Sequence, residues 1–92
     1  MTELNVVHDR QNHRFEVSVE GHLAYLAYMD LGKQTLDVYR TFVPDALRGQ
    51  GVAALLTQAA LDFASREGYQ VIPSCSYVER YMERNGLDVA DD

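Results

Sequence analysis

The feature that most constrains the fold is a change of hydrophobic period near the middle of the chain. Up to Val43 apolar residues recur every second position, as in β-strands, and from Gly51 they recur every 3.6 positions, as in an amphipathic helix. A glycine-containing segment, Val43–Ala53, joins the two patterns. Because 92 residues suffice for only one hydrophobic core, strands and helix must share it. The sequence therefore predicts one α+β domain.

Four strands are expected before this junction, in an antiparallel run. The segment His22–Asp30 is apolar or aromatic on both faces, which predicts a central strand. A hairpin turn is expected at Leu31-Gly32-Lys33, since Gly32 tolerates a positive φ. Pro44 ends the last strand of the run. The expected strands are a short one near Asn5–His8, then Phe15–Val19, His22–Asp30 and Thr35–Val43.

After the junction the pattern predicts a helix, a strand and a second helix. The first helix runs from Val52 to a terminating Gly68, and the strand Tyr69–Ile72 ends at Pro73. A strand that follows such a helix returns beside the strand before it, which gives a β-α-β-α arrangement in one mixed sheet. The apolar stripe of the first helix comprises Val52, Leu55, Leu56, Ala59, Ala60 and Phe63.

The second helix is predicted from a capping box, Ser76-x-x-Glu79. Its inner face is expected to comprise Tyr77, Val78, Tyr81 and Met82. The domain is expected to span residues 1–87, with an acidic, disordered tail at 88–92.

Composition excludes several classes of function. Fourteen acidic against eight basic residues give a net charge of −6, which disfavours nucleic-acid binding. No stretch is apolar enough to cross a membrane, and the first residues lack the pattern of a secretory signal. The single cysteine, Cys75, forms no intrachain disulfide, and His8, His13 and His22 lack metal-ligand spacing. We therefore expect a cytoplasmic protein without a metal, either monomeric or weakly dimeric.

The junction carries the chemistry. Gly49 and Gly51 let the backbone approach a ligand, and the first turn of a helix offers unpaired N–H donors that suit a phosphate or pyrophosphate. Arg48 adds a cation, and no acidic residue occurs from Arg48 to Ala54. A glycine-rich turn that merely starts a helix is an equally weighted alternative. The P-loop is absent, because no Gly-Lys-Ser/Thr follows, and the dinucleotide-binding pattern lacks its acidic residue after the next strand.

Three blocks occur in order: Thr41-x-Val43-Pro44, Arg48-Gly-Gln-Gly-Val-Ala53 and Pro73-x-Cys-x-Tyr-Val-x-x-Tyr81. The chain resembles the GCN5-related N-acetyltransferase superfamily, whose signature Gln/Arg-x-x-Gly-x-Gly/Ala is matched by Arg48, Gly51 and Ala53. More narrowly, it resembles the very small single-domain branch of that superfamily, over about residues 15–84. At this length we expect it to be too short for the extra N-terminal helices and the C-terminal hairpin that usually shape the acceptor site of larger members.

The resemblance implies an acyl-CoA N-acyltransferase-like fold and acetyl-CoA as a substrate. The pantetheine arm would pair with the strand end at Thr41, Phe42 and Val43, and the thioester would point toward Cys75. The acetyl group would pass to a primary amine, either a protein lysine or a small amine. The residues implied to hold the pyrophosphate are Arg48, Gly49, Gln50, Gly51, Val52 and Ala53.

Catalytic roles follow from the same resemblance, with alternatives left open. Cys75 is either an acyl relay or a small packing residue beside the cofactor sulfur, at equal weight. Tyr81 is implied as the acid for the leaving thiolate, with Tyr77 a weaker rival, although a tyrosine at this spacing is also typical of a core. For the base there are only two candidates, Asp37 and Glu16. The competing functions are a non-catalytic acyl-CoA-binding module and a bare interaction domain.

Overall fold

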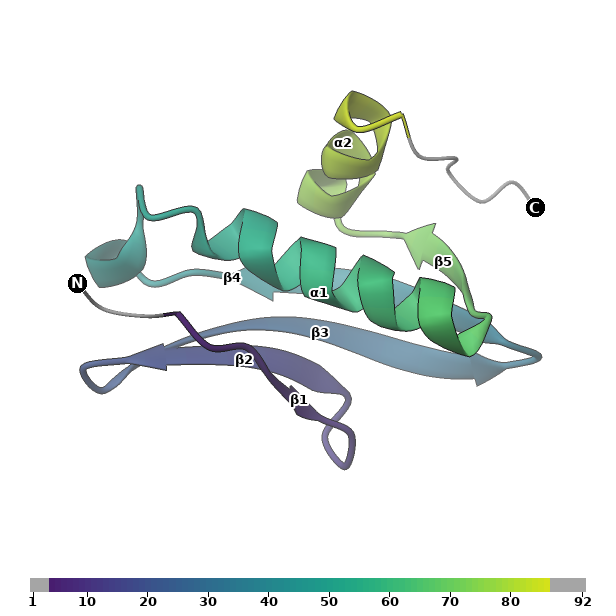
Figure 1. The fold of residues 1–92 in the computed structure, drawn as a ribbon, viewed down its shortest axis with the longest axis horizontal. Helices are drawn as coiled ribbons and strands as arrows, with labels where there is room; N and C mark the ends of the chain where they lie inside the picture. The colour runs from purple at the N-terminus through teal and green to yellow at the C-terminus, as the bar shows by residue number, and fades with distance from the viewer. Residues whose placement is uncertain (1–3, 87–92) are drawn as a thin grey trace.

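The computed structural model describes residues 4–86 and contains one five-stranded sheet with two helices (Figure 1). The strands lie in the order β1-β2-β3-β4-β5, and every neighbouring pair is antiparallel except β4 and β5. This confirms the predicted α+β class and the mixed sheet. The predicted tail, 88–92, lies outside the described residues. The elements are β1 (Val7–Asp9), β2 (Arg14–Val19), β3 (His22–Gly32), β4 (Thr35–Phe42), a 3₁₀ turn (Asp45–Leu47), α1 (Val52–Glu67), β5 (Gln70–Pro73) and α2 (Ser76–Arg84).

Helix α1 crosses one face of the sheet and forms the core with it (Figure 1). Its buried residues are Val52, Leu56, Thr57, Ala60, Phe63 and Ala64. Leu55 and Ala59, which were also predicted for the stripe, are half-buried and pack against the core, whereas the prediction omitted Thr57. Thr57 is tolerated in the core because its hydroxyl donates a hydrogen bond to the Ala53 carbonyl, 2.8 Å away, which satisfies the polar group within the helix.

Two predicted boundaries were wrong. Leu31 and Gly32 belong to β3, and the hairpin turn is Lys33-Gln34, with φ of 52° and 57°. Two successive residues with positive φ match the twist of a two-residue hairpin, so the local geometry outweighs the residue preference for glycine. Pro73 closes β5 opposite Val38 instead of lying beyond it, which an edge strand allows because its outer N–H groups need no partner there.

The second face of the sheet has no helix over it in the described part of the chain. β3 is the middle strand, as predicted, yet Leu23 is 39% exposed and Met29 46% exposed on this face. The described part of the chain supplies only one helical layer, and that layer lies over the other face.

Candidate functional site

Strands β4 and β5 pair over only the first half of β4 and then separate, and we call this point of separation the split. They pair from Thr35 and Gln70 to Val38 and Pro73, and the last contact is the Cys75 N–H donating to the Val38 carbonyl at 2.9 Å. Beyond this point β4 continues to Phe42 with β3 as its only strand neighbour among residues 4–86. The outer main-chain edge of this half-strand therefore offers hydrogen-bonding groups to an extended ligand.

The loop that follows β4 is rich in unpaired donors. Six successive backbone N–H groups, from Gly49 to Ala54, have no hydrogen-bond acceptor within residues 4–86, whereas the Leu55 N–H bonds the Gly51 carbonyl at 3.0 Å. Gly49 and Gly51 have φ of 83° and 74°, and a Cβ at either position would meet nothing within 4 Å. No acidic residue lies in the first turn of α1. The loop can therefore bind an anion through its main chain.

A cavity of about 240 Å³ lies against this loop, and Tyr77 from α2 contributes to its wall. Most of the residues implied to hold the pyrophosphate surround it. Gln50 belongs to the same loop without lining the cavity, and Thr41 and Phe42 lie further back along the open half of β4. The lining residues are Val43, Leu47, Arg48, Gly49, Gly51, Val52, Ala53, Ala54 and Tyr77.

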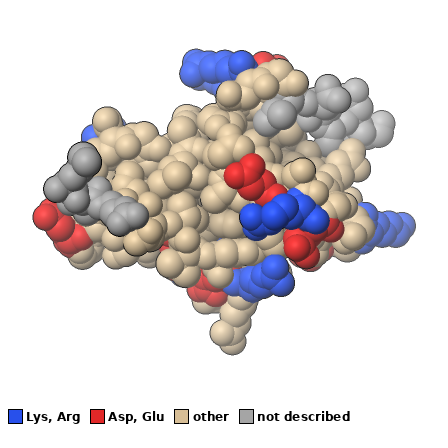
Figure 2. Space-filling view, in the orientation of Figure 1, with Lys and Arg blue, Asp and Glu red and all other residues tan. Residues whose placement is uncertain are grey.

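The Arg48 side chain forms an ion pair with Asp45. Its Nε lies 3.1 Å from Asp45 Oδ1, with both side chains largely exposed. An exposed pair of this kind contributes little free energy, so Arg48 can exchange it for a phosphate oxygen. Figure 2 shows acidic and basic side chains interspersed on the α1 face. The N–H groups of the loop, more than a cationic patch, make it attractive to anions.

Cys75 spans the split between the strands. It is half-buried, and its Sγ lies 3.6 Å from Thr41 Oγ1, so the structure joins two residues that are 34 positions apart. Cys75 is itself the N-cap of α2, without a side-chain capping hydrogen bond. The predicted capping box was therefore wrong: Ser76 is already helical, and the Glu79 N–H bonds the Cys75 carbonyl at 3.0 Å.

Tyr77 and Tyr81 of α2 were predicted to lie on its inner face, but neither is buried in the core. Val78 and Met82 are buried, but Tyr77 is 38% exposed and Tyr81 half-buried. The Tyr81 hydroxyl donates a hydrogen bond to Gln58 Oε1 of α1, a contact that the helical pattern did not indicate. Partial burial, and then the neighbouring Tyr81, raise the pKa of Tyr77 above its ordinary value. Tyr77 is therefore protonated at neutral pH and able to donate a hydrogen bond.

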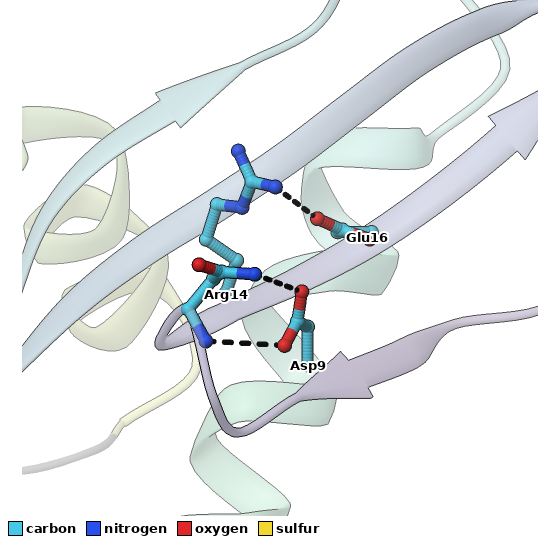
Figure 3. A network of polar contacts seen from close by, with 4 residues as sticks. Asp9, Arg14 and Glu16 are labelled. Carbon is cyan, nitrogen blue, oxygen red and sulfur yellow. Dashed lines mark hydrogen bonds and ion pairs between the residues drawn. The ribbon is translucent and has the colours of Figure 1, made fainter.

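The two candidate bases, Glu16 and Asp37, differ in the partners of their carboxylates. Glu16 forms an ion pair with Arg14 at 2.8 Å on β2 (Figure 3). Asp37 of β4 is opposite Ile72 of β5 and immediately precedes Val38, the last residue of β4 that pairs with β5. Asp37 Oδ1 is buried and has no hydrogen-bond partner in the part of the chain that the structure describes. Asp37 is thus the carboxylate next to the split, and its free oxygen lacks the donor that a buried acceptor normally has.

Within residues 4–86, no group of three or more His, Cys, Asp or Glu side chains is arranged to hold a metal ion. Neither described helix combines the length and apolar character of a membrane span.

A mixed sheet split between a strand and its parallel neighbour, followed by a helix with free N–H donors, defines an acyl-CoA N-acyltransferase-like fold. A GCN5-like protein from Staphylococcus aureus, solved by NMR, has this fold: it superposes with a TM-score of 0.75 at 22% identity, covering 99% of this chain and 94% of that one. Protein NATD1 of Mus musculus is 41% identical over 86 residues, which is 91% of this chain and 78% of the relative. Protein NATD1 of Xenopus tropicalis is 39% identical over 88 residues, covering 94% and 81%.

A family model described as GCN5-related N-acetyl-transferase matches residues 14–91. The chain belongs to the GCN5-related N-acetyltransferase family. Its predicted family and fold are thereby confirmed.

Proposed function

We propose that this protein transfers the acetyl group of acetyl-CoA to a primary amine, on a protein lysine or a small molecule. The main observation in support is the run of six unpaired N–H groups from Gly49 to Ala54, placed directly after the open half of β4. A pyrophosphate with an extended amide-containing arm matches this juxtaposition of an anion site and a free strand edge.

In this proposal the cofactor follows β4 backwards from the loop. The pyrophosphate lies on the main chain of residues 48–53, and the pantetheine arm runs beside Thr41, Phe42 and Val43. The thioester then lies at the split, near Cys75. Of the two strands at the split, only β4 extends past it, so the arm takes the position that a longer β5 would occupy.

The reaction needs a neutral amine. A free lysine has a pKa of about 10.4, so deprotonation at pH 7 costs about 4–5 kcal/mol. Asp37 is our candidate base, because its buried Oδ1 is unpartnered while Glu16 is held by Arg14. The amine nitrogen attacks the thioester carbon, and the developing oxyanion accepts a hydrogen bond from a β4 N–H near Phe42 or Val43. The C–S bond then breaks, and the thiolate takes a proton.

Two tyrosines can supply that proton. Tyr81 is our candidate acid, but its hydroxyl donates to Gln58, so it must exchange this acceptor for the thiolate. Tyr77 lines the cavity at the loop and is the alternative. Cys75 has two possible roles: it either receives the acetyl group first, in a double displacement, or holds Thr41 beside the cofactor sulfur while the amine attacks directly.

Ligand binding is the first test. Coenzyme A at one hundred times its Kd should raise the free energy of unfolding by about 2.7 kcal/mol, which in a domain of this size shifts Tm by about 10 °C or more. Pantetheine, which lacks the phosphates, should stabilise far less. Absence of heat in a titration and of any Tm shift with coenzyme A would leave only the interaction-domain alternative.

Turnover is the second test, and it addresses the alternative of a non-catalytic acyl-CoA-binding module. That alternative is favoured by the sheet face opposite α1, where Leu23 and Met29 are exposed and no described element encloses an acceptor. Thiol release from acetyl-CoA should depend on added amine, above the rate of hydrolysis without it. Coenzyme A binding without amine-dependent release, over a broad panel of amines and peptides, would favour the module.

A further inference from the structure

The sheet face opposite α1 carries one arginine beside the split, Arg40. In the strand register Arg40 is opposite Ala27, and the next pair on the same face of the sheet is Phe42 with Tyr25. The Arg40 guanidinium carbon lies 5.8 Å from the centre of the Tyr25 ring and 5.9 Å from that of Phe42. Contacts of this kind with two rings restrict the side chain while leaving its N–H donors free.

The neighbouring arginine on this face is in a different state. Arg14 also lies over the Tyr25 ring, at 5.5 Å, but it is neutralised by Glu16 at 2.8 Å (Figure 3). Arg40 has no carboxylate within 4.0 Å among residues 4–86. Of the two guanidinium groups that flank Tyr25, Arg40 is therefore the one available to an external anion.

A β-bulge brings Asp37 and Arg40 to the same face. Residues three apart in a regular strand point to opposite faces, but the register slips between Ala27 and Tyr28, so Asp37 pairs with Met29 and Arg40 with Ala27. Ala27 and Met29 are two residues apart, which places the two pairs about 7 Å from each other. Asp37 and Arg40 do not form an ion pair, and Asp37 Oδ1 has no hydrogen-bond partner among residues 4–86.

The open face thus carries a half-buried carboxylate and an exposed guanidinium at neighbouring positions, next to the split of β4 and β5, and neither forms an ion pair within residues 4–86. We propose that the acceptor is a small amine that also bears a carboxylate: its nitrogen is held at Asp37 and its carboxylate at Arg40. This inference rests on the proposed function and narrows its acceptor to amino-acid-like amines, in place of polyamines or lysine side chains. An arginine guanidinium binds a carboxylate through two parallel hydrogen bonds, so Arg40 should favour an amine that bears a carboxylate over one that bears a neutral group of the same shape.

Thiol release from acetyl-CoA tests this with matched amines. The acids are glycine, 3-aminopropanoate, 4-aminobutanoate and 5-aminopentanoate, and each is compared with its amide, which has the same size but lacks the carboxylate charge. The best acid should exceed its amide by about tenfold or more in kcat/KM, mainly through KM. Arg40→Gln should abolish this preference by lowering kcat/KM for the acid to that for the amide, and Arg40→Lys should restore part of it. Arg66→Gln, in the last turn of α1, serves as the charge-matched control and should retain the full preference.

Two results would overturn the inference while leaving the proposed function intact: acids and amides that react equally in the unaltered protein, or a preference that survives in Arg40→Gln. Titration of coenzyme A into Arg40→Gln separates a failure of the acceptor assignment from a failure of the proposed function, since the affinity of this variant for coenzyme A should match that of the unaltered protein. Coenzyme A binding without release by any amine would reject both the acceptor assignment and the transferase. Absence of coenzyme A binding in the unaltered protein would reject the proposed function as a whole.

Discussion

The two halves of strand β4 differ in what surrounds them. Thr35–Val38 has a strand on each side, and Leu36 and Val38 are each 2% exposed in the core. After the bulge, residues up to Phe42 pair only with β3, and Phe42 is 40% exposed. The first half therefore contributes to stability, whereas the second half keeps main-chain groups free for a ligand.

A similar contrast holds along α1. Near its C-terminal end, Phe63 packs against His8, Phe15 and Tyr69. At its N-terminal end the donors from Gly49 to Ala54 remain unpaired, although such groups are usually satisfied. In both elements the part whose main-chain groups are all hydrogen-bonded builds the fold. The adjoining part, which has main-chain groups without a partner among residues 4–86, is where we place the ligand.

The largest effect on stability is expected in the first half of β4. Leu36→Ala should lower the free energy of unfolding by about 2–5 kcal/mol, because it removes a buried side chain and leaves a cavity. Denaturant titration measures this change. Leu23→Ala, on the exposed face of β3, is the matched control and should cost less than about 1 kcal/mol. Equal losses in the two variants would mean that the exposed face is covered in solution.

At the split, substitution should affect turnover far more than stability. Cys75→Ala should reduce amine-dependent thiol release more than about a hundredfold, equivalent to about 2.7 kcal/mol, while coenzyme A still binds. Cys75→Ser retains a hydroxyl that can bond Thr41 but is a poor acyl acceptor, so it separates a relay from a positioning role. Unchanged turnover in Cys75→Ala would exclude direct involvement of the thiol.

The loop glycines allow a smaller and more selective test. Gly51→Ala and Gly21→Ala both place a side chain at positive φ, 74° and 81°, in open space, and each should cost about 1–2 kcal/mol of stability. Only Gly51→Ala should also weaken coenzyme A binding, measured by calorimetry, because Gly21 lies in the hairpin between β2 and β3. If both variants bind coenzyme A as the unaltered protein does, the anion site does not depend on the conformation of this loop.

The smallest effect is expected from pH, far from the split. His8 Nε2 lies 2.7 Å from the Tyr28 hydroxyl, and its ring stacks on Phe15. Burial, and then the charge of Arg10, lower the pKa of His8 below its ordinary value of 6.5. The charged form is thus disfavoured in the folded state, so stability is complete above about pH 6.5 and decreases as pH falls through that value toward the lower folded pKa.

Thermal unfolding at pH 8.0 and pH 5.5 measures this effect. His8→Gln preserves a hydrogen-bonding group without the titration, and it should narrow the Tm difference between the two pH values by a few degrees. An unchanged difference would show that His8 titrates as freely in the folded chain as in the unfolded one.

Much of the architecture was predictable because it depends on local alternation of side chains. The period of two marked the strands, the period of 3.6 marked α1, and the glycines at 49 and 51 marked the loop between them. The errors arose where partners distant in sequence decide the outcome. Tyr81, predicted to face the core, instead donates a hydrogen bond to Gln58 of α1, 23 positions earlier in the chain, and Pro73, predicted to follow the strand, pairs within β5 opposite Val38 of β4.

The sequence by itself determined the order of strands and helices, the glycine loop at the start of α1 and the family to which the chain belongs. Only the tertiary structure decided that Cys75 meets Thr41 across the split, and that Asp37, alone of the two candidate bases, lies there with a free oxygen. It also decided that a bulge places Asp37 and Arg40 on one face. Periodicity is a property of neighbours along the chain. The contact of Cys75 with Thr41 and the placement of Asp37 and Arg40 on one face depend instead on strand register, which is fixed only when the sheet assembles.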